Sequence, residues 1–129
     1  MSSLRKKISA ISTAQALIVN AELYATEKER HVSRFRFSKH NLKMISGRAD
    51  LSPMFIRELI GVLWEIGYSM IDLPDGDYAF IETPKIDVWP RIGWGRIDAA
   101  LRSKEPEVAI ELEFNRCFPD FKSELSLED

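Results

Sequence analysis

In the first two thirds of the chain, apolar residues recur at two different spacings, one typical of strands and one typical of helices. In residues 34–37, Phe35 and Phe37 alternate with arginines, and this period of two predicts a strand. Residues 3–28 instead place apolar side chains along one face, as a long helix does. Residues 1–11 could also form a separate arm, either a dimerisation element or a plain extension. The apolar face of the helix consists of Leu4, Ile8, Ile11, Ile18, Ala21 and Ala25.

Two shorter helices are marked by the residues at their ends. Ser38 predicts the start of the first, because a serine hydroxyl can accept a free backbone N–H of the first turn, and Gly47 predicts its end. Ser52 followed by Pro53 predicts the start of the second, with a cap and then a proline at the first helical position. Gly67 ends a run of apolar residues at helical spacing, which are Ile56, Leu59, Ile60, Leu63 and Ile66.

A β-hairpin is predicted beyond these helices. Residues 68–73 and 78–83 flank the sequence PDGD, in which Asp75 and Gly76 supply the positive φ angles that a tight hairpin requires. The predicted order is therefore helix, strand, helix, helix and hairpin.

The last third of the chain has a different pattern. Residues 84–96 contain two prolines, two glycines and two tryptophans, which predicts an ordered connector packed by Trp89 and Trp94. Residues 96–103 fit either a helical turn or a strand. In residues 107–114 apolar side chains alternate with mostly acidic ones, and this period of two predicts a strand with one acidic face.

The order of elements resembles that of the winged helix-turn-helix superfamily over residues 10–83. The expected fold class is thus α+β, a winged helix-turn-helix with a C-terminal β extension. Residues 1–83 would form the winged-helix domain with its long N-terminal helix. Residues 84–129 would form an extension packed on that domain and ending in an acidic tail, residues 122–129.

Composition limits the class of protein further. The chain has 129 residues, of which 45% are hydrophobic, and can therefore bury one core. Its single cysteine excludes an intramolecular disulfide and favours a cytoplasmic location. No apolar run approaches the roughly 18 residues that a membrane-spanning helix needs.

The net charge of −2 conceals an asymmetry between the two halves of the chain. Residues 1–67 hold 11 Lys and Arg against 6 Asp and Glu, a net charge of +5, whereas residues 68–129 hold 7 against 14, a net charge of −7. A basic half and an acidic half indicate different partners, or one half shielding the other. Chance segregation of solvated side chains is the alternative.

The winged-helix resemblance implies that the second helix of the turn enters the major groove of duplex DNA. Arg57 is the only cation on the N-terminal part of that helix, beside Ser52, Met54, Phe55 and Glu58. Positive charge lies mainly on the preceding strand and helix, where it could contact phosphates without reading sequence. Each of these residues alone could equally belong to a solvated face. The candidate DNA-binding residues are Arg34, Arg36, Lys39, His40, Lys43, Arg48, Ser52 and Arg57.

A protein partner is the alternative to DNA. It could bind an apolar patch of Met54 and Phe55 with any exposed part of Trp64, or the acidic C-terminal half. Phe55 and Trp64 could equally lie in the core. Carboxylates around the tip of the predicted hairpin count against DNA, because they would repel phosphates. These carboxylates belong to Asp72, Asp75 and Asp77.

A second resemblance lies in residues 96–114. If two strands paired across residues 104–107, Asp98, Glu111 and Glu113 would converge as in the metal site of PD-(D/E)xK restriction endonucleases. The resemblance implies three Mg²⁺ ligands and metal-assisted cleavage of a phosphodiester. Because Glu113 replaces the lysine that is usual in that motif, we expect no working metal site, no cofactor and no enzymatic activity.

The sequence therefore favours a small winged-helix regulator or accessory factor that binds duplex DNA, of a size typical of phage and mobile-element proteins. An inhibitor or adaptor that uses a winged-helix scaffold for protein contacts is the alternative. A homodimer is compatible with either function.

Overall fold

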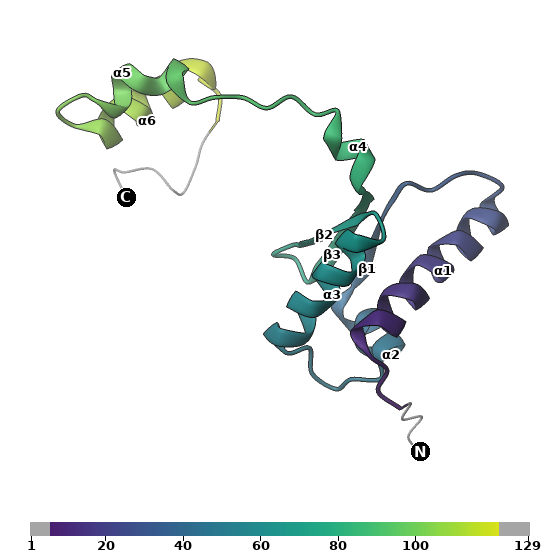
Figure 1. Cartoon of the computed structure of the whole chain (residues 1–129). Coiled ribbons are helices and arrows are strands. Elements are labelled where there is room, and N and C mark those ends of the chain that lie inside the picture. The colour runs from purple at the N-terminus through teal and green to yellow at the C-terminus, as the bar shows by residue number, and fades with distance from the viewer. Residues whose placement is uncertain (1–5, 122–129) are drawn as a thin grey trace. The chain divides into compact units, whose positions relative to one another are not determined.

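The computed structural model describes residues 6–121 of the 129-residue chain. The chain divides into two compact units, one up to Trp89 and one from Pro90 onward, termed unit 1 and unit 2 (Figure 1). No helix within residues 6–121 is long and apolar enough to cross a membrane. The acidic tail, residues 122–129, lies outside the described residues.

Helix α1 spans Ala10–Lys28 and follows a serine cap. The hydroxyl of Ser9 accepts a hydrogen bond from the backbone N–H of Ser12 at 3.0 Å, which satisfies a free donor of the first turn. Residues 6–9 lie outside the helix, and the backbone N–H of Ile8 donates to the carbonyl of Ser46. Within the described residues, the helix predicted over residues 3–28 therefore begins only after the Ser9 cap.

Strand β1, Arg34–Ser38, leads directly into helix α2, Lys39–Ser46. The hydroxyl of Ser38 accepts a hydrogen bond from the backbone N–H of Asn41, so one residue both ends the strand and caps the helix. Gly47 follows α2 with a φ of 70°, the left-handed conformation that glycine adopts at low cost. Both predicted boundaries of this helix are confirmed.

Helix α3, Pro53–Glu65, also begins where its sequence predicts. The hydroxyl of Ser52 accepts a hydrogen bond from the backbone N–H of Phe55 at 3.1 Å, and proline occupies the first helical position. One side of the helix, with Phe55, Leu59 and Leu63 at intervals of four residues, is buried.

Strands β2, Tyr68–Asp72, and β3, Asp77–Glu82, form the predicted hairpin. Gly76 has the positive φ, 92°, at its turn, but the prediction of a positive φ at Asp75 is wrong, because the loop of residues 73–76 is longer than a two-residue turn. Strand β1 pairs with the other edge of β3, giving a three-stranded antiparallel sheet of order β1-β3-β2. In this register Phe35 lies opposite Phe80, and their rings stack with centroids 4.8 Å apart.

The core of unit 1 lies where α1, α2 and α3 meet the sheet (Figure 1). Each large apolar side chain buried there contributes about 1.5–3 kcal/mol relative to exposure. The predicted α+β class and the predicted order of helices and strands are therefore confirmed for unit 1. The core consists of Ala14, Leu17, Leu42, Phe55, Leu59, Leu63, Met70, Tyr78 and Phe80.

Residues 84–121 form helices and no strand, so the predicted C-terminal β extension is wrong. In the ambiguous segment 96–103, residues 96–101 are helical as well. The elements are α4 (Thr83–Asp87), the 3-10 helix η1 (Gly95–Ile97), α5 (Asp98–Leu101) and α6 (Pro106–Cys117).

Helix α6 replaces the strand that alternation predicted. The alternating apolar residues form two pairs spaced by four, Val108 with Leu112 and Ile110 with Phe114, and on a helix each pair shares a face. Pro106 suits the first turn of a helix, and Glu, Ala and Leu are strong helix formers. A strand would also need a neighbouring strand, and residues 84–121 supply none.

The connector between the units is not packed by its tryptophans, contrary to the prediction. The side chains of Trp89 and Trp94 are both exposed. Neither belongs to the core cluster of buried residues or to the apolar residues packed against it.

Candidate functional site

The outward side of α3 carries two large exposed apolar side chains. Met54 is 67% exposed and Trp64 is 61% exposed. Arg57 and Gly61, both exposed, lie between them at spacings of three and four residues, so all four share one side of the helix. This surface of four residues is termed the α3 outer face.

Burial of the opposite side fixes the orientation of this face. Phe55, Leu59 and Leu63 point into the core, and Trp64, one residue after Leu63, is rotated by about 100° from it around the helix axis. The interpretation of Trp64 as a core residue is therefore wrong. Phe55 is only 4% exposed, so it belongs to the core and not to an apolar surface patch.

Arg48, a candidate phosphate ligand, is held within the fold. Its Nη2 donates to the carbonyl oxygen of Ile8 at 2.7 Å, and its guanidinium carbon lies 3.8 Å from the centre of the Phe55 ring. Its Nε is buried without a hydrogen-bond partner in the described structure. The guanidinium thus joins the segment before α1 to the start of α3 and is not presented to solvent as a phosphate ligand would be.

Arg36 is neutralised at the tip of the hairpin. Its guanidinium forms ion pairs with Asp75 and, at 2.9 Å, with Asp77. Hydrogen bonds with Asp75 and then Asp77 raise the pKa of Arg36, and the backbone N–H of Asp77, helped by Arg36, lowers the pKa of Asp75. Since two carboxylates face one guanidinium, the tip has a net negative charge.

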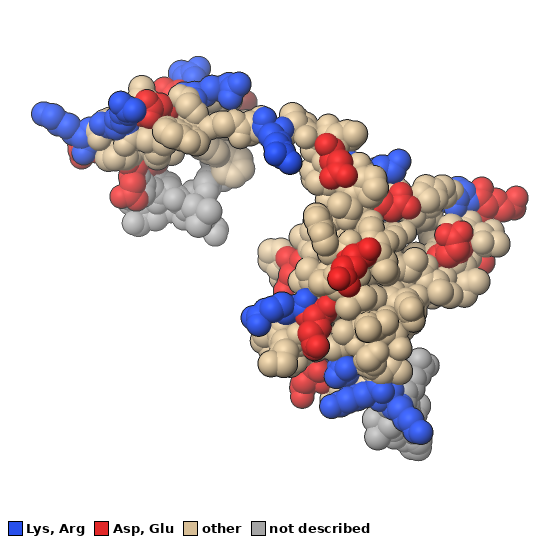
Figure 2. All heavy atoms as spheres, viewed as in Figure 1, with Lys and Arg blue, Asp and Glu red and all other residues tan. Residues whose placement is uncertain are grey.

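The other predicted DNA-binding residues have different environments. Ser52 uses its hydroxyl to cap α3. In residues 6–89, 11 Lys and Arg balance 11 Asp and Glu, and on the face drawn in Figure 2 the two charges are mixed over unit 1. Five candidates lie at the surface, exposed or partly exposed, and form no ion pair with any described residue, namely Arg34, Lys39, His40, Lys43 and Arg57.

The three carboxylates of the nuclease resemblance lie on helices rather than on paired strands. Asp98, on α5, pairs with Arg102 at 3.0 Å. Glu111 and Glu113 lie on α6, where Glu113 pairs with Arg116 at 2.8 Å. Within residues 6–121 no group of three or more His, Cys, Asp or Glu side chains is placed to hold a metal ion.

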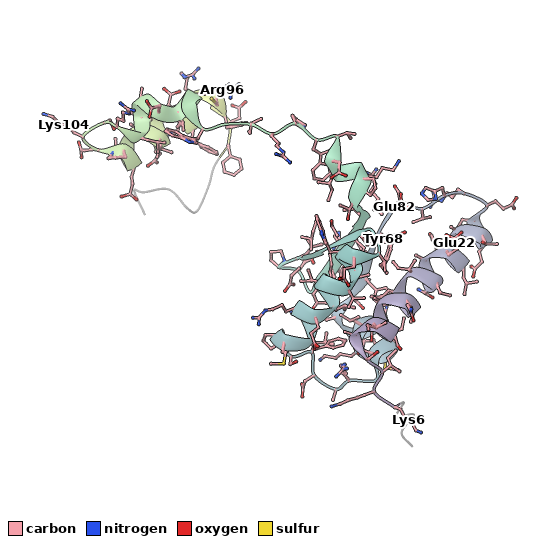
Figure 3. The ribbon with its side chains drawn as sticks, in the orientation of Figure 1. Lys6, Glu22, Tyr68, Glu82, Arg96 and Lys104 are labelled. Atoms are coloured by element: carbon pink, nitrogen blue, oxygen red, sulfur yellow. The ribbon has the colours of Figure 1, made fainter. Side chains whose placement is uncertain are left out.

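Sequence reasoning missed a polar cluster at the end of the sheet. Tyr68 lies opposite Glu82 in the register of β2 and β3, and Glu22 of α1 lies close to them (Figure 3). Burial raises the pKa of Tyr68, and Glu82 and Glu22 raise it further. His31 Nε2 is also 3.2 Å from a carboxylate oxygen of Glu82. The strand register places Tyr68 opposite Glu82, and tertiary packing brings Glu22 of α1 and His31 to them, so no local pattern indicated this cluster.

Unit 2 leaves its large apolar side chains uncovered within the described structure. No residue between 90 and 121 is buried, because so short a segment cannot enclose a core of its own. The exposed side chains are Ile92, Trp94, Leu101, Val108, Ile110, Leu112, Phe114, Phe118 and Phe121.

The described elements define an α+β protein whose first unit places α1, α2 and α3 against a three-stranded antiparallel sheet. Comparison of the chain with protein-family models, curated proteins and solved structures finds no match. Function is therefore inferred from the chemistry of the exposed surfaces.

Proposed function

We propose that unit 1 is a winged helix-turn-helix module that binds a protein partner through the α3 outer face. The order helix, strand, helix, helix and hairpin supports the winged-helix assignment. A winged helix presents the second helix of its turn to its ligand, and α3 occupies that place. The observation that carries the proposal is the exposure of Met54 and Trp64 on the outward side of this helix.

The residue types on this face suit a protein better than a duplex. Tryptophan, methionine and arginine are enriched in protein interfaces, and tryptophan and arginine supply many of the dominant contacts. Reading of bases relies on Arg, Lys, Asn and Gln, and the α3 outer face offers only Arg57. The protein is therefore best interpreted as an adaptor or inhibitor that acts by association.

Duplex DNA is the second candidate ligand. It is favoured by the positively charged side chains of β1 and α2 that have no ion-pair partner among the described residues, Arg34, Lys39 and Lys43. These could contact phosphates, and Arg57 would be the one cation of α3 available to a base. The paired Arg36 and the acidic hairpin tip weaken this candidate.

Site-specific photo-crosslinking tests the leading proposal. Benzoylphenylalanine is placed at Met54 and, as a matched control, at the exposed Asn20 of α1, and both variants are irradiated in extract of the cells that produce the protein. We expect a protein adduct specific to position 54, which mass spectrometry identifies. Equal adducts at both positions would contradict the proposal.

Calorimetry with the purified partner then measures how much the α3 outer face contributes to the free energy of binding. Trp64→Ala should raise Kd about 30-fold, because loss of a dominant interface side chain costs on the order of 2 kcal/mol. Trp94→Ala, which removes an exposed tryptophan of unit 2, is the control. A Kd that is unchanged by Trp64→Ala would refute binding through the α3 outer face.

A further inference from the structure

A shallow hollow of about 420 Å³ opens beside the α3 outer face, between the first turn of α1 and the middle of α3. Gly61 creates part of it, because a Cβ added there would meet nothing within 4 Å. The α3 backbone is therefore accessible at a point where any other residue would cover it. The hollow is lined by Ser9, Ala10 and Ile11 on α1 and by Glu58, Gly61, Val62 and Glu65 on α3.

The lining of the hollow is mostly apolar. Ile11 is 58% exposed although it lies beside the packed contact of α1 with α3, and Val62 is partly exposed. Together with the accessible backbone of Gly61, these side chains leave apolar surface in water that a partner's apolar side chain would cover favourably. Absence of a Cβ at Gly61 also permits close approach of a second helix, because small residues let backbones pack tightly.

Two of the residues that line the hollow, Glu58 and Glu65, are acidic. Glu58 and Glu65 are seven residues apart, so they lie on one side of α3 about 10.5 Å apart along its axis. Both carboxylates are exposed, and neither forms an ion pair with any described residue. Arg57, the one cation of α3, belongs to the adjoining outer face. The hollow therefore combines apolar lining residues with two acidic groups at a helical spacing.

We infer that this hollow receives a basic amphipathic helix of the protein partner. Its apolar side chain lies over Gly61, and Lys or Arg residues seven positions apart, about 10.5 Å, pair with Glu58 and Glu65. The inference rests on the proposed function, since it names the chemistry of the partner that the α3 outer face binds. Opposite charges at matched spacing select such a helix over an acidic one.

Two synthetic helices test the inference on the full chain. The first is a 15-residue peptide with leucines on one side and lysines at two positions seven apart, and the second has glutamate at those two positions. We expect the lysine peptide to bind, with ¹H–¹⁵N shift changes confined to residues 9–11 and 58–65, and the glutamate peptide to bind at least tenfold more weakly. Equal affinities, or shift changes elsewhere, would overturn the inference.

Substitutions of Glu58, Glu65 and Gly61 test whether the peptide binds in this hollow or is only attracted by the charge of the protein. Glu58→Gln with Glu65→Gln should weaken the lysine peptide at least tenfold, whereas Glu27→Gln with Glu29→Gln, which removes equal charge from exposed residues at the end of α1, should not. Gly61→Leu should abolish binding by filling the hollow without touching the core. Equal losses in both charge variants would overturn the inference.

The same variants distinguish failure of this inference from failure of the proposed function. With the crosslinked partner, sensitivity to Trp64→Ala but not to Glu58→Gln and Glu65→Gln would overturn the inference and leave the proposed function standing. Insensitivity to both changes would overturn both.

Discussion

The guanidinium of Arg48 lies over the ring of Phe55, 3.8 Å from its centre, and donates to the carbonyl of Ile8. One side chain therefore connects the segment before α1, the turn after α2 and the first turn of α3. Its position explains why a cation in the turn between α2 and α3 is part of the fold and not part of a ligand-binding surface. Burial of Phe55, Leu59 and Leu63 orients α3, and the contact of Arg48 with Phe55 adds to this at the first turn of the helix.

Replacing Arg48 should destabilise unit 1. Arg48→Ala removes the hydrogen bond to Ile8 and the contact with Phe55, and we expect a loss of about 1–3 kcal/mol in the free energy of unfolding. Urea denaturation followed by circular dichroism measures it. Lys39→Ala, which removes an exposed cation, should change stability by no more than about 0.5 kcal/mol. Equal effects of the two substitutions would contradict the structural role of Arg48.

Two glycines should respond oppositely to alanine. Gly47 has a φ of 70°, and an added Cβ would lie 2.3 Å from the carbonyl oxygen of Lys6, so Gly47→Ala should destabilise by at least about 1–3 kcal/mol. Gly61 lies inside α3 with nothing within 4 Å of an added Cβ, so Gly61→Ala should stabilise by about 0.5–1 kcal/mol. Thermal unfolding of both variants provides the comparison. A Gly47→Ala variant as stable as the parent would show that the close approach of Lys6 is not maintained in solution.

The acidic hairpin tip should suppress binding of DNA. Asp75→Asn with Asp77→Asn releases Arg36 from its ion pairs and removes two negative charges. We therefore expect duplex binding, measured by fluorescence anisotropy at about 50 mM salt, to be weak for the parent chain and stronger for the double variant. The salt dependence should steepen by about one logarithmic unit for each further phosphate that the double variant neutralises.

The DNA experiment also has a result that would reverse the functional assignment. Tight, sequence-specific duplex binding by the parent chain, lost on Arg57→Ala, would make DNA the ligand and α3 a base-reading helix. Glu27→Gln with Glu29→Gln, at the end of α1, removes the same two negative charges as the double hairpin variant and controls for the change in net charge.

Stability should fall at alkaline pH because of the partly buried Tyr68. Burial raises the pKa of Tyr68, with contributions from Glu82 and Glu22, so the folded state keeps the proton to a higher pH than the unfolded chain, whose tyrosines ionise near about pH 10. The contribution of protonated Tyr68 to the free energy of unfolding is fully present below about pH 10 and is lost as the pH rises through the raised pKa of Tyr68. Urea titrations at several pH values between about 9 and 11 measure the slope.

Phenylalanine at position 68 isolates this effect. Tyr68→Phe should make the alkaline loss of stability smaller, since the side chain can no longer ionise, whereas Tyr24→Phe, at an exposed position of α1, should leave it unchanged. A steeper or equal loss in Tyr68→Phe would show that Tyr68 does not resist ionisation in the fold.

Structural features that depend only on residues adjacent in the sequence were predictable from it. Ser38, Ser52 and Gly47 mark helix ends correctly, because caps and left-handed glycines act within one turn of the backbone. The hairpin at Gly76 was predictable for the same reason. The strand predicted near Leu112 failed, because apolar residues at every second position also form two faces of a helix.

The sequence by itself thus determined the order of elements from α1 to β3, both ends of α2 and the start of α3. Only the tertiary structure decided which cations are presented to solvent. Arg48 is held by Phe55 and Ile8, and Arg36 by the hairpin tip 39 and 41 residues away in sequence. The physical reason is that an ion pair or stacking contact between distant residues depends on strand register and helix rotation, which no local pattern of residue types encodes.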